Sequence, residues 1–507
     1  MSRPRRHDRS VIQRDSGRAW SFRSTAAVTL TCGAGGALGH SFAPPYTMPV
    51  PFSMYAFGTG AALILSFVIV GLFATVPAYD GGARDRLRVH APAAPPAIPI
   101  WTVGRVLSIV LLMLCIVTGF LGTQNLYANF NMTFFWIVFV LGVPYLSAVI
   151  GDFYAAVNPW KAIVEAVESL TGRAFVGVVG HPQRFGYYPA LLLYMLFIWI
   201  ELFARVTPRA LSIALLIYTL INLAGAYLLG KSAWFRYGEF FGVCLRLIGK
   251  MSPWARPWDP QERAADPGGR RWRMPFVGLL EARAEHMSLV VFVLFMLSST
   301  AFDGLHGTQA WVALFWKGLY PAIAPYFTTV AGQQYAFSTK LYYGWQWLSL
   351  AISPLAYLAV FGACVAAAKW AARATLPVRE LVLQLAFAMV PIAFVYHVTH
   401  YYTMLLAQGG QIVRLVSDPF GAGWNLLGTA RMQIDPFVVD VNVIWHTQVA
   451  LILLGHIASV YLAHVEALRL FPTARRAALS QLPMLALMVL FTAFGLWILS
   501  LPLSIGG

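Results

Sequence analysis

Three histidines have the spacing and depth expected of a shared metal site. His397 and His400 are three residues apart in the segment YHVTHYY (396–402), so on a helix their rings lie on one face. His446 occurs in a second apolar segment, about five residues from its outer end, which is a depth of about 7 Å at 1.5 Å per residue. His400 has a similar depth from the same membrane surface. Imidazoles from two helices suit a borderline divalent ion with an open coordination position. We predict that His397, His400 and His446 bind zinc, manganese or copper and act in catalysis.

Three other residues could add to this site. Asp303 and His306 end another apolar segment at the same level, and we predict Asp303 as a catalytic residue and His306 as a metal ligand. His40 follows Ala37-Leu38-Gly39, and cleavage there would give it a free amine that could chelate copper with its imidazole. The alternative for each histidine is a position at the membrane interface, where amphipathic rings are stable.

The composition requires that membrane helices position these residues. The chain has 507 residues, of which 59% are hydrophobic and only 11% are charged, whereas a soluble protein has about 25% charged residues. Several apolar runs reach 18 or more residues, the length that crosses about 30 Å of hydrocarbon. We therefore predict an all-α fold, a polytopic bundle of transmembrane helices. A disordered chain, a coiled coil and a secreted disulfide scaffold are excluded.

About ten mature spans follow a signal-like segment. Residues 1–39 combine seven arginines with a short apolar stretch, as in a signal sequence. The predicted spans are 53–76, 102–122, 132–151, 189–206, 208–230, 286–303, 342–366, 380–406, 441–466 and 481–502. The predicted organisation is a first half (40–256), a cytoplasmic loop (257–285) and a second half with the histidine-rich spans (286–507).

The lysines and arginines predict the orientation. The connections on one side hold 22 of them and those on the other side hold six, and the basic side of a membrane protein is cytoplasmic. The same asymmetry accounts for the net charge of +16 without a nucleic-acid partner. The histidine site then faces the periplasm or exterior of a bacterial inner membrane.

Shorter features are also predictable. Residues 232–250 mix aromatic and charged side chains, so we expect an interfacial helix there. Asn158 and Pro159 have the types of an N-cap and first helical residue. Glu201 and Arg205 are four residues apart, and a helical ion pair would explain both.

Several motifs resemble a known family. The segments HSF (40–42), YTMPVP (46–51), GDFYAAVNPW (151–160) and YHVTHY (396–401) are similar, in the same order, to bacterial membrane proteins known as fenitrothion hydrolases. The chain departs from that family at Pro45-Tyr46-Thr47, where its members carry Arg-Tyr-Asp. The resemblance implies hydrolysis of an aryl phosphorothioate triester, and it transfers no catalytic residue.

The function expected from these features is a membrane-embedded, metal-assisted hydrolase of lipophilic triesters, which enter from the bilayer at the outer leaflet. A bound divalent ion would lower the pKa of its water to about 7. Two alternatives use the same histidines: a copper or haem redox component, in which His456 could take part, and a transporter or assembly subunit.

Overall fold

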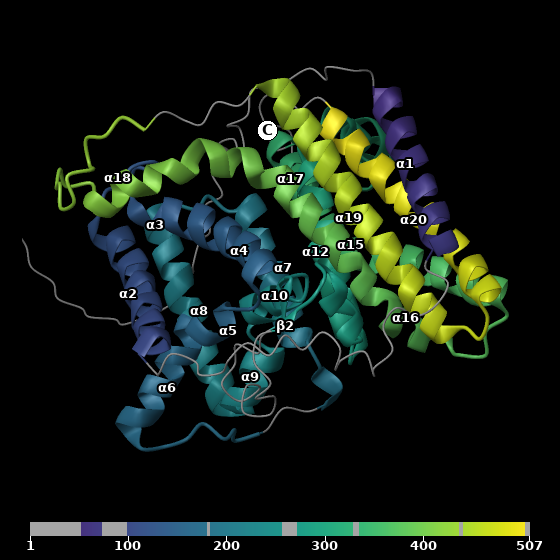
Figure 1. The fold of residues 1–507 in the computed structure, drawn as a ribbon. Coiled ribbons are helices and arrows are strands. Elements are labelled where there is room, and N and C mark those ends of the chain that lie inside the picture. Colours follow the sequence, from purple (N-terminus) through teal and green to yellow (C-terminus); the bar gives the residue numbers. More distant parts are fainter. Residues whose placement is uncertain are drawn as a thin grey trace, which may run out of the picture. The chain divides into compact units, whose positions relative to one another are not determined.

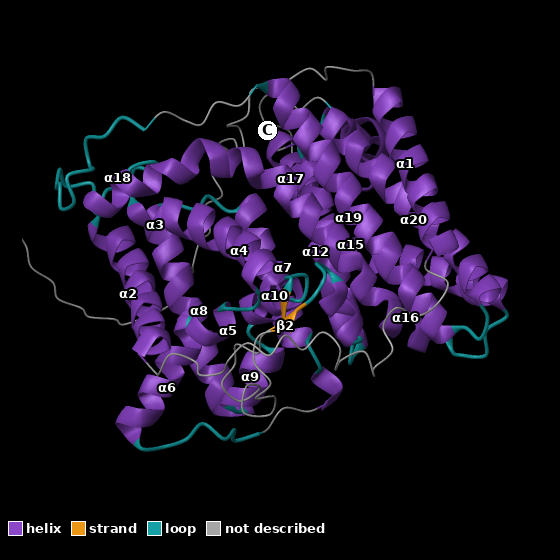
Figure 2. Ribbon diagram, in the orientation of Figure 1, coloured by secondary structure: helices purple, strands orange, loops and turns teal. Residues whose placement is uncertain are grey.

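The helices of the structure, a computed structural model, follow the predicted apolar segments (Figures 1 and 2). The structure describes residues 52–73, 99–179, 183–255, 271–327, 334–434 and 440–501. Within these ranges, nine helices are long and apolar enough to cross a membrane, and α7 (Tyr188–Phe203) is a shorter apolar helix at the position of a tenth predicted span. The prediction of an all-α, multi-pass helix bundle is therefore confirmed.

Each predicted span corresponds to one long helix or to a run of consecutive helices. The runs combine α-helix with π- or 3₁₀-helix, as in Phe130–Ile150, whose middle is π-helical. These elements are α1 (Phe52–Phe73), α2 (Pro99–Leu121), α3 (Phe130–Met132), η2 (Thr133–Gly142), α4 (Val143–Ile150), α7, α8 (Pro208–Leu229), α12 (Met287–His306), α15 (Gln334–Ala372), α16 (Val378–Leu385), η7 (Ala386–Met389), α17 (Val390–Gln408), η8 (Gly409–Gln411), α18 (Ile412–Ser417), α19 (Val441–Leu470) and α20 (Ala474–Ser500).

Short elements connect these helices. They are α5 (Tyr154–Val157), α6 (Pro159–Thr171), η3 (Gln183–Phe185), α9 (Lys231–Tyr237), α10 (Phe240–Gly249), β1 (Trp254–Ala255), β2 (Arg271–Trp272), η4 (Val277–Glu281), α13 (Gln309–Ala313), η5 (Leu314–Leu319), α14 (Tyr320–Ile323) and η6 (Ala324–Tyr326). The strands β1 and β2 pair antiparallel, with Trp254 opposite Trp272.

Helix α12 is the central element of the bundle. Every residue from Ser288 to Asp303 is buried, because α7, α15 and α17 pack around it. The first described helix, α1, packs against α19 and α20 at the other end of the sequence, as Figure 1 shows. The predicted halves thus contact each other through several helices, and their division at 257–285 stays a prediction.

The segment 232–250, for which we predict an interfacial helix, forms α9 and α10, and α10 is covered by other helices of the bundle. Seven of its ten residues are buried, and it packs against α4, α7 and α17. Its first turn begins at Glu239, which is itself fully buried and accepts hydrogen bonds from the amides of Phe241 and Gly242. Of the charged residues in this segment, Arg236 precedes α10 and pairs with Glu285, whereas Arg246 lies within α10 and donates to the carbonyl of Arg236.

The predicted N-cap at Asn158 is confirmed. Its side chain accepts hydrogen bonds from the amides of Trp160 and Lys161, with Pro159 as the first residue of α6. Near the other end of α6, Glu168 binds Lys231 of α9 and the amide of Phe175. Partial burial opposes the ionisation of Glu168, but these hydrogen bonds outweigh it and lower its pKa. Both contacts tie α6 to its neighbours.

Several predictions fall outside the described residues. They are the signal-like segment 1–39, the cleavage site, His40 and most of the polar loop before β2.

Candidate functional site

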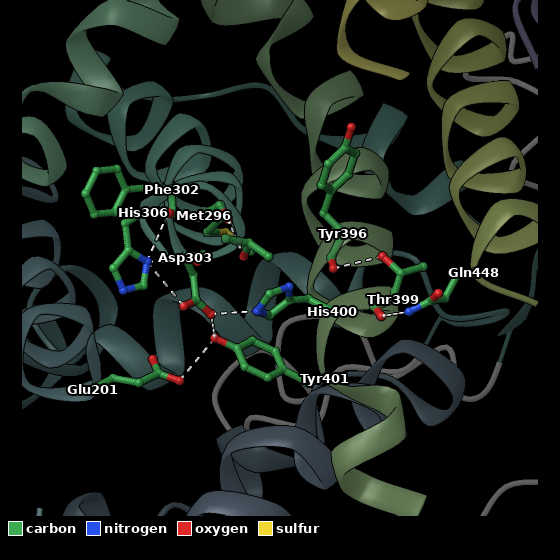
Figure 3. Close-up of polar contacts among 11 residues, drawn as sticks. Glu201, Met296, Phe302, Asp303, His306, Tyr396, Thr399, His400, Tyr401 and Gln448 are labelled. Atoms are coloured by element: carbon green, nitrogen blue, oxygen red, sulfur yellow. Dashed lines mark hydrogen bonds and ion pairs between the residues drawn. The ribbon is translucent and has the colours of Figure 1, made fainter. Parts of the chain in front are cut away.

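A buried carboxylate, Asp303, is the centre of a group of polar side chains within the described bundle. It lies in the last turn of α12 and is 7% exposed. Its Oδ2 is 2.8 Å from His400 Nε2 and 2.6 Å from the hydroxyl of Tyr401, both on α17. Figure 3 shows the two side chains approaching the carboxylate together. Asp303 therefore accepts hydrogen bonds from two consecutive residues of one helix.

A second carboxylate joins this group through Tyr401. The Tyr401 hydroxyl is also 3.2 Å from Oε1 of Glu201, in the last turn of α7 (Figure 3). The predicted ion pair between Glu201 and Arg205 is not among the contacts described, because α7 ends at Phe203 and Arg205 lies exposed beyond it. Glu201 thus belongs to the site, although its spacing from Arg205 favoured a helical ion pair.

Three helices bring these residues to one place. In the predicted orientation, α7, α12 and α17 all run toward the exterior. The last turns of α7 and α12 lie beside the part of α17 that holds His400 and Tyr401. Gly304 permits close packing there, since a Cβ at this position would lie 2.7 Å from the Ile498 side chain and 3.8 Å from the His400 ring. A larger residue would push α20 away from the site.

His306 lies beside Asp303 but contributes mainly to the end of α12. Its Nδ1 is 2.8 Å from the carbonyl oxygen of Asp303 and 3.9 Å from the carboxylate Oδ1. The ring stacks on Phe302 at a centroid distance of 5.6 Å. The geometry is that of a helix C-cap, in which the imidazole donates to a terminal carbonyl.

His397 lies one turn before His400 and faces a cavity. Its ring contacts Tyr145 and Tyr401 at centroid distances of 6.0 and 5.0 Å, and the described contacts include no hydrogen bond to its nitrogens. The cavity has a volume of about 60 Å³, room for roughly four water molecules. His397 is thus available to a molecule in the cavity.

The cavity walls are mostly apolar, and the polar groups of the lining gather where α7, α12 and α17 meet. The polar lining consists of Glu201, Ser299, Thr300, Asp303, His397 and Tyr401. The aromatic lining consists of Phe139, Tyr194, Phe197, Phe240, Phe241 and Phe394. Apolar walls with a few convergent polar groups are typical of a binding or active site, although this cavity is smaller than the roughly 300–1,000 Å³ of a small-molecule pocket. Part of the wall is the π-helix η2, an irregularity that is frequent at such sites.

The predicted convergence of three histidines is not what the structure has. His446 is exposed on α19, its Nδ1 is 2.6 Å from the carbonyl of Asn442, and its ring lies beside Tyr55 of α1. Within the described ranges, no three His, Cys, Asp or Glu side chains are grouped to hold one metal ion. Two side chains at the same depth in the membrane meet only when their helices also turn them toward each other. The rotation of α19 about its axis directs His446 toward Tyr55 of α1 instead.

His456 is buried without the interhelical bond that a polar residue inside a bundle often makes. Its Nδ1 is 2.8 Å from the carbonyl of Ile452 in the same helix, and its Nε2 has no hydrogen-bond partner among the described residues.

Comparison with known proteins gives no relative for this site, since no family model, curated protein or solved structure matches the chain.

Proposed function

We propose that the chain is a membrane-embedded hydrolase of small, neutral, lipophilic esters, organophosphate triesters among them. The observation that carries the proposal is the aromatic cavity in which an imidazole, His397, and two bridged carboxylates, Glu201 and Asp303, line one space. Such a lining offers a general base and a general acid to one molecule, and an ester enters only as the cavity widens beyond its volume of about 60 Å³. The resemblance to fenitrothion hydrolases points to the same reaction class.

The reaction can be written with this chain's own residues. A water molecule in the cavity gives a proton to His397, and its oxygen forms the new bond to phosphorus or carbonyl carbon. The bond to the leaving oxygen breaks, and Glu201 in its acid form gives that oxygen a proton. Tyr401 and His400 donate to Asp303 and hold the carboxylate in place, and the oxygen of Tyr401 faces Glu201.

The lining also favours a substrate class. No lysine or arginine is among the described lining residues, whereas two carboxylates are. An anionic phosphate monoester or diester would meet repulsion and lose its hydration in such a cavity. A neutral ester concentrates in the bilayer and needs no counter-charge, so neutral esters are the expected substrates.

Metal assistance stays a prediction that the same assay tests. The mechanism above uses no metal ion, and His446 lies outside the group of residues that it uses. Hydrolysis that survives chelation supports the imidazole mechanism, and hydrolysis that is lost on chelation and restored by zinc, manganese or copper supports the predicted metal site.

The test is hydrolysis by the purified full chain in lipid vesicles. We expect release of the phenol from a neutral nitrophenyl phosphorothioate triester, measured by absorbance, at a rate proportional to the protein. The corresponding anionic diester should be hydrolysed at least about tenfold more slowly, a difference of about 1.4 kcal/mol. Absence of triester hydrolysis above that of empty vesicles would overturn the proposal.

We propose further that the site faces the periplasm of a bacterial inner membrane, because the basic connections lie at the other side. An epitope tag inserted at Asp266, in the polar loop between the halves, should be inaccessible to antibody in intact spheroplasts and accessible after permeabilisation. A tag at Gly428, in the connection after α18, should be accessible in both. The reverse pattern would invert the orientation.

A further inference from the structure

The contacts of Tyr401 require a proton on one of the two carboxylates. A tyrosine hydroxyl has one hydrogen to donate, yet it lies between two carboxyl oxygens, 2.6 Å from Asp303 and 3.2 Å from Glu201. The shorter contact is that of a hydroxyl donating to an ionised acceptor. With that hydrogen on the Asp303 side, the 3.2 Å contact is a hydrogen bond only when Glu201 is protonated and donates to the oxygen of Tyr401.

Asp303 is the acid that stays ionised. Its Oδ2 accepts from both Tyr401 and His400 Nε2, whereas the described hydrogen bonds of the Glu201 side chain comprise only the one to Tyr401. Two ionised carboxylates joined through one hydroxyl would repel each other in an apolar cavity, where charges are poorly solvated. The favourable arrangement has one negative charge, on Asp303.

We propose that Glu201 is protonated at rest and that Tyr401, Asp303 and His400 form a proton path that reloads it from the outer end of the bundle. The protonation of Glu201 stands apart from any reaction, whereas the reloading role rests on the proposed hydrolysis. The outer member of the path is the most accessible, since the His400 side chain is 25% exposed and that of Asp303 is 4% exposed.

The proton reaches Glu201 in steps that each conserve protons and charge. After Glu201 has protonated a leaving group, an external proton binds His400 Nδ1, and the Nε2 proton moves to Asp303. Asp303 passes a proton to the oxygen of Tyr401 as Tyr401 gives its own hydroxyl proton to Glu201. The end state is neutral His400 with its hydrogen on Nδ1, ionised Asp303, intact Tyr401 and protonated Glu201. His400 must then exchange this hydrogen back to Nε2 through water before the next transfer. One proton has moved inward, and no charge stays on the tyrosine.

The first test reads Glu201 directly. Infrared spectra of the full chain in vesicles should contain the C=O stretch of a protonated carboxylic acid that shifts in heavy water. Subtraction of the Glu201→Gln spectrum should isolate this band, and Asp303→Asn should weaken it, because Tyr401 then donates to Glu201 and the repulsion from the second carboxylate is gone. A band that is unchanged in Glu201→Gln would overturn the proposal whether or not the protein hydrolyses esters.

The second test separates reloading from a structural role of Tyr401. In Tyr401→Phe the relay is broken, so a protein whose Glu201 is already loaded should release about one equivalent of product rapidly and then turn over at least about tenfold more slowly. Tyr357→Phe on α15, a tyrosine that stacks on Phe491, should behave as the unchanged protein. Equal slowing of the first and later turnovers, or no slowing, would overturn the relay. If no variant or parent hydrolyses esters while the infrared band is present, only the proposed hydrolysis fails.

Discussion

Replacing His397 with glutamine should lower kcat for triester hydrolysis by about a hundredfold to ten-thousandfold, the usual contribution of a general base. Glutamine occupies a similar volume and keeps polar atoms at the cavity, but it cannot take a proton from water. The substrate should still bind, so KM should change by less than about threefold while kcat falls. Steady-state hydrolysis in vesicles, with thermal unfolding to confirm an intact fold, measures both effects.

His446→Gln is the matched control, and it separates the two mechanisms. His446 is exposed on α19 beside Tyr55 and lies outside the group that lines the cavity. The imidazole mechanism therefore expects unchanged kcat in this variant. A three-histidine metal site expects the opposite, with activity and bound metal lost together in His397→Gln, His400→Gln and His446→Gln. Equal loss of activity in His397→Gln and His446→Gln would contradict the cavity mechanism.

The spans could be predicted from the sequence because crossing a bilayer depends on local composition and length. The predicted span 208–230 and helix α8 (Pro208–Leu229) differ by one residue, since Thr207 caps the helix and Pro208 opens it. The burial of α10 could not be predicted in this way. It depends on a carboxylate, Glu239, whose partners are distant in the sequence.

Part of the candidate site could also be predicted from local sequence. Asp303, His397 and His400 could be selected because ionisable residues within spans are costly and therefore functional candidates. Their partners Glu201 and Tyr401 depend on how α7 and α17 rotate around α12, which the spacing within one helix does not determine. His446 shows the converse, since its depth matched that of His400 while α19 turned it toward α1.

Two motifs of the family resemblance have distinct structural roles. The segment 396–401 supplies His397, His400 and Tyr401 to the site. The segment 151–160 lies outside the site but supports the wall of the cavity: Trp160 stacks on Phe241 at 5.7 Å, and Asn158 donates a hydrogen bond to Glu239. A change in the second motif should therefore act on the cavity through α10.

Glu239→Ala is expected to cause the largest loss of stability among single carboxylate replacements. Glu239 is fully buried and accepts from the Tyr218 hydroxyl at 2.7 Å, from Asn158 at 3.1 Å and from two amides that open α10. Loss of an N-cap costs about 0.5–2 kcal/mol, and each buried donor left without an acceptor costs about 1–3 kcal/mol. With partial relaxation, we expect a loss of about 2–4 kcal/mol in the free energy of unfolding.

Thermal unfolding in detergent, followed by circular dichroism, measures this loss. Glu285→Ala is the control, because the Glu285 side chain is half-exposed. Its pair with Arg236 and its long contact with the Tyr187 hydroxyl, at 3.3 Å, should together contribute no more than about 1 kcal/mol. Glu239→Gln should be intermediate, since its amide oxygen still accepts at the start of α10 while its NH₂ group faces other donors. Equal stability of Glu239→Ala and Glu285→Ala would contradict the anchoring role.

Phe240, Phe241 and Cys244 of α10 line the cavity, so a loosened α10 should also raise KM for the triester, whereas His397→Gln lowers kcat. The two variants therefore distinguish the residue that acts on the substrate from the residue that holds the cavity in shape.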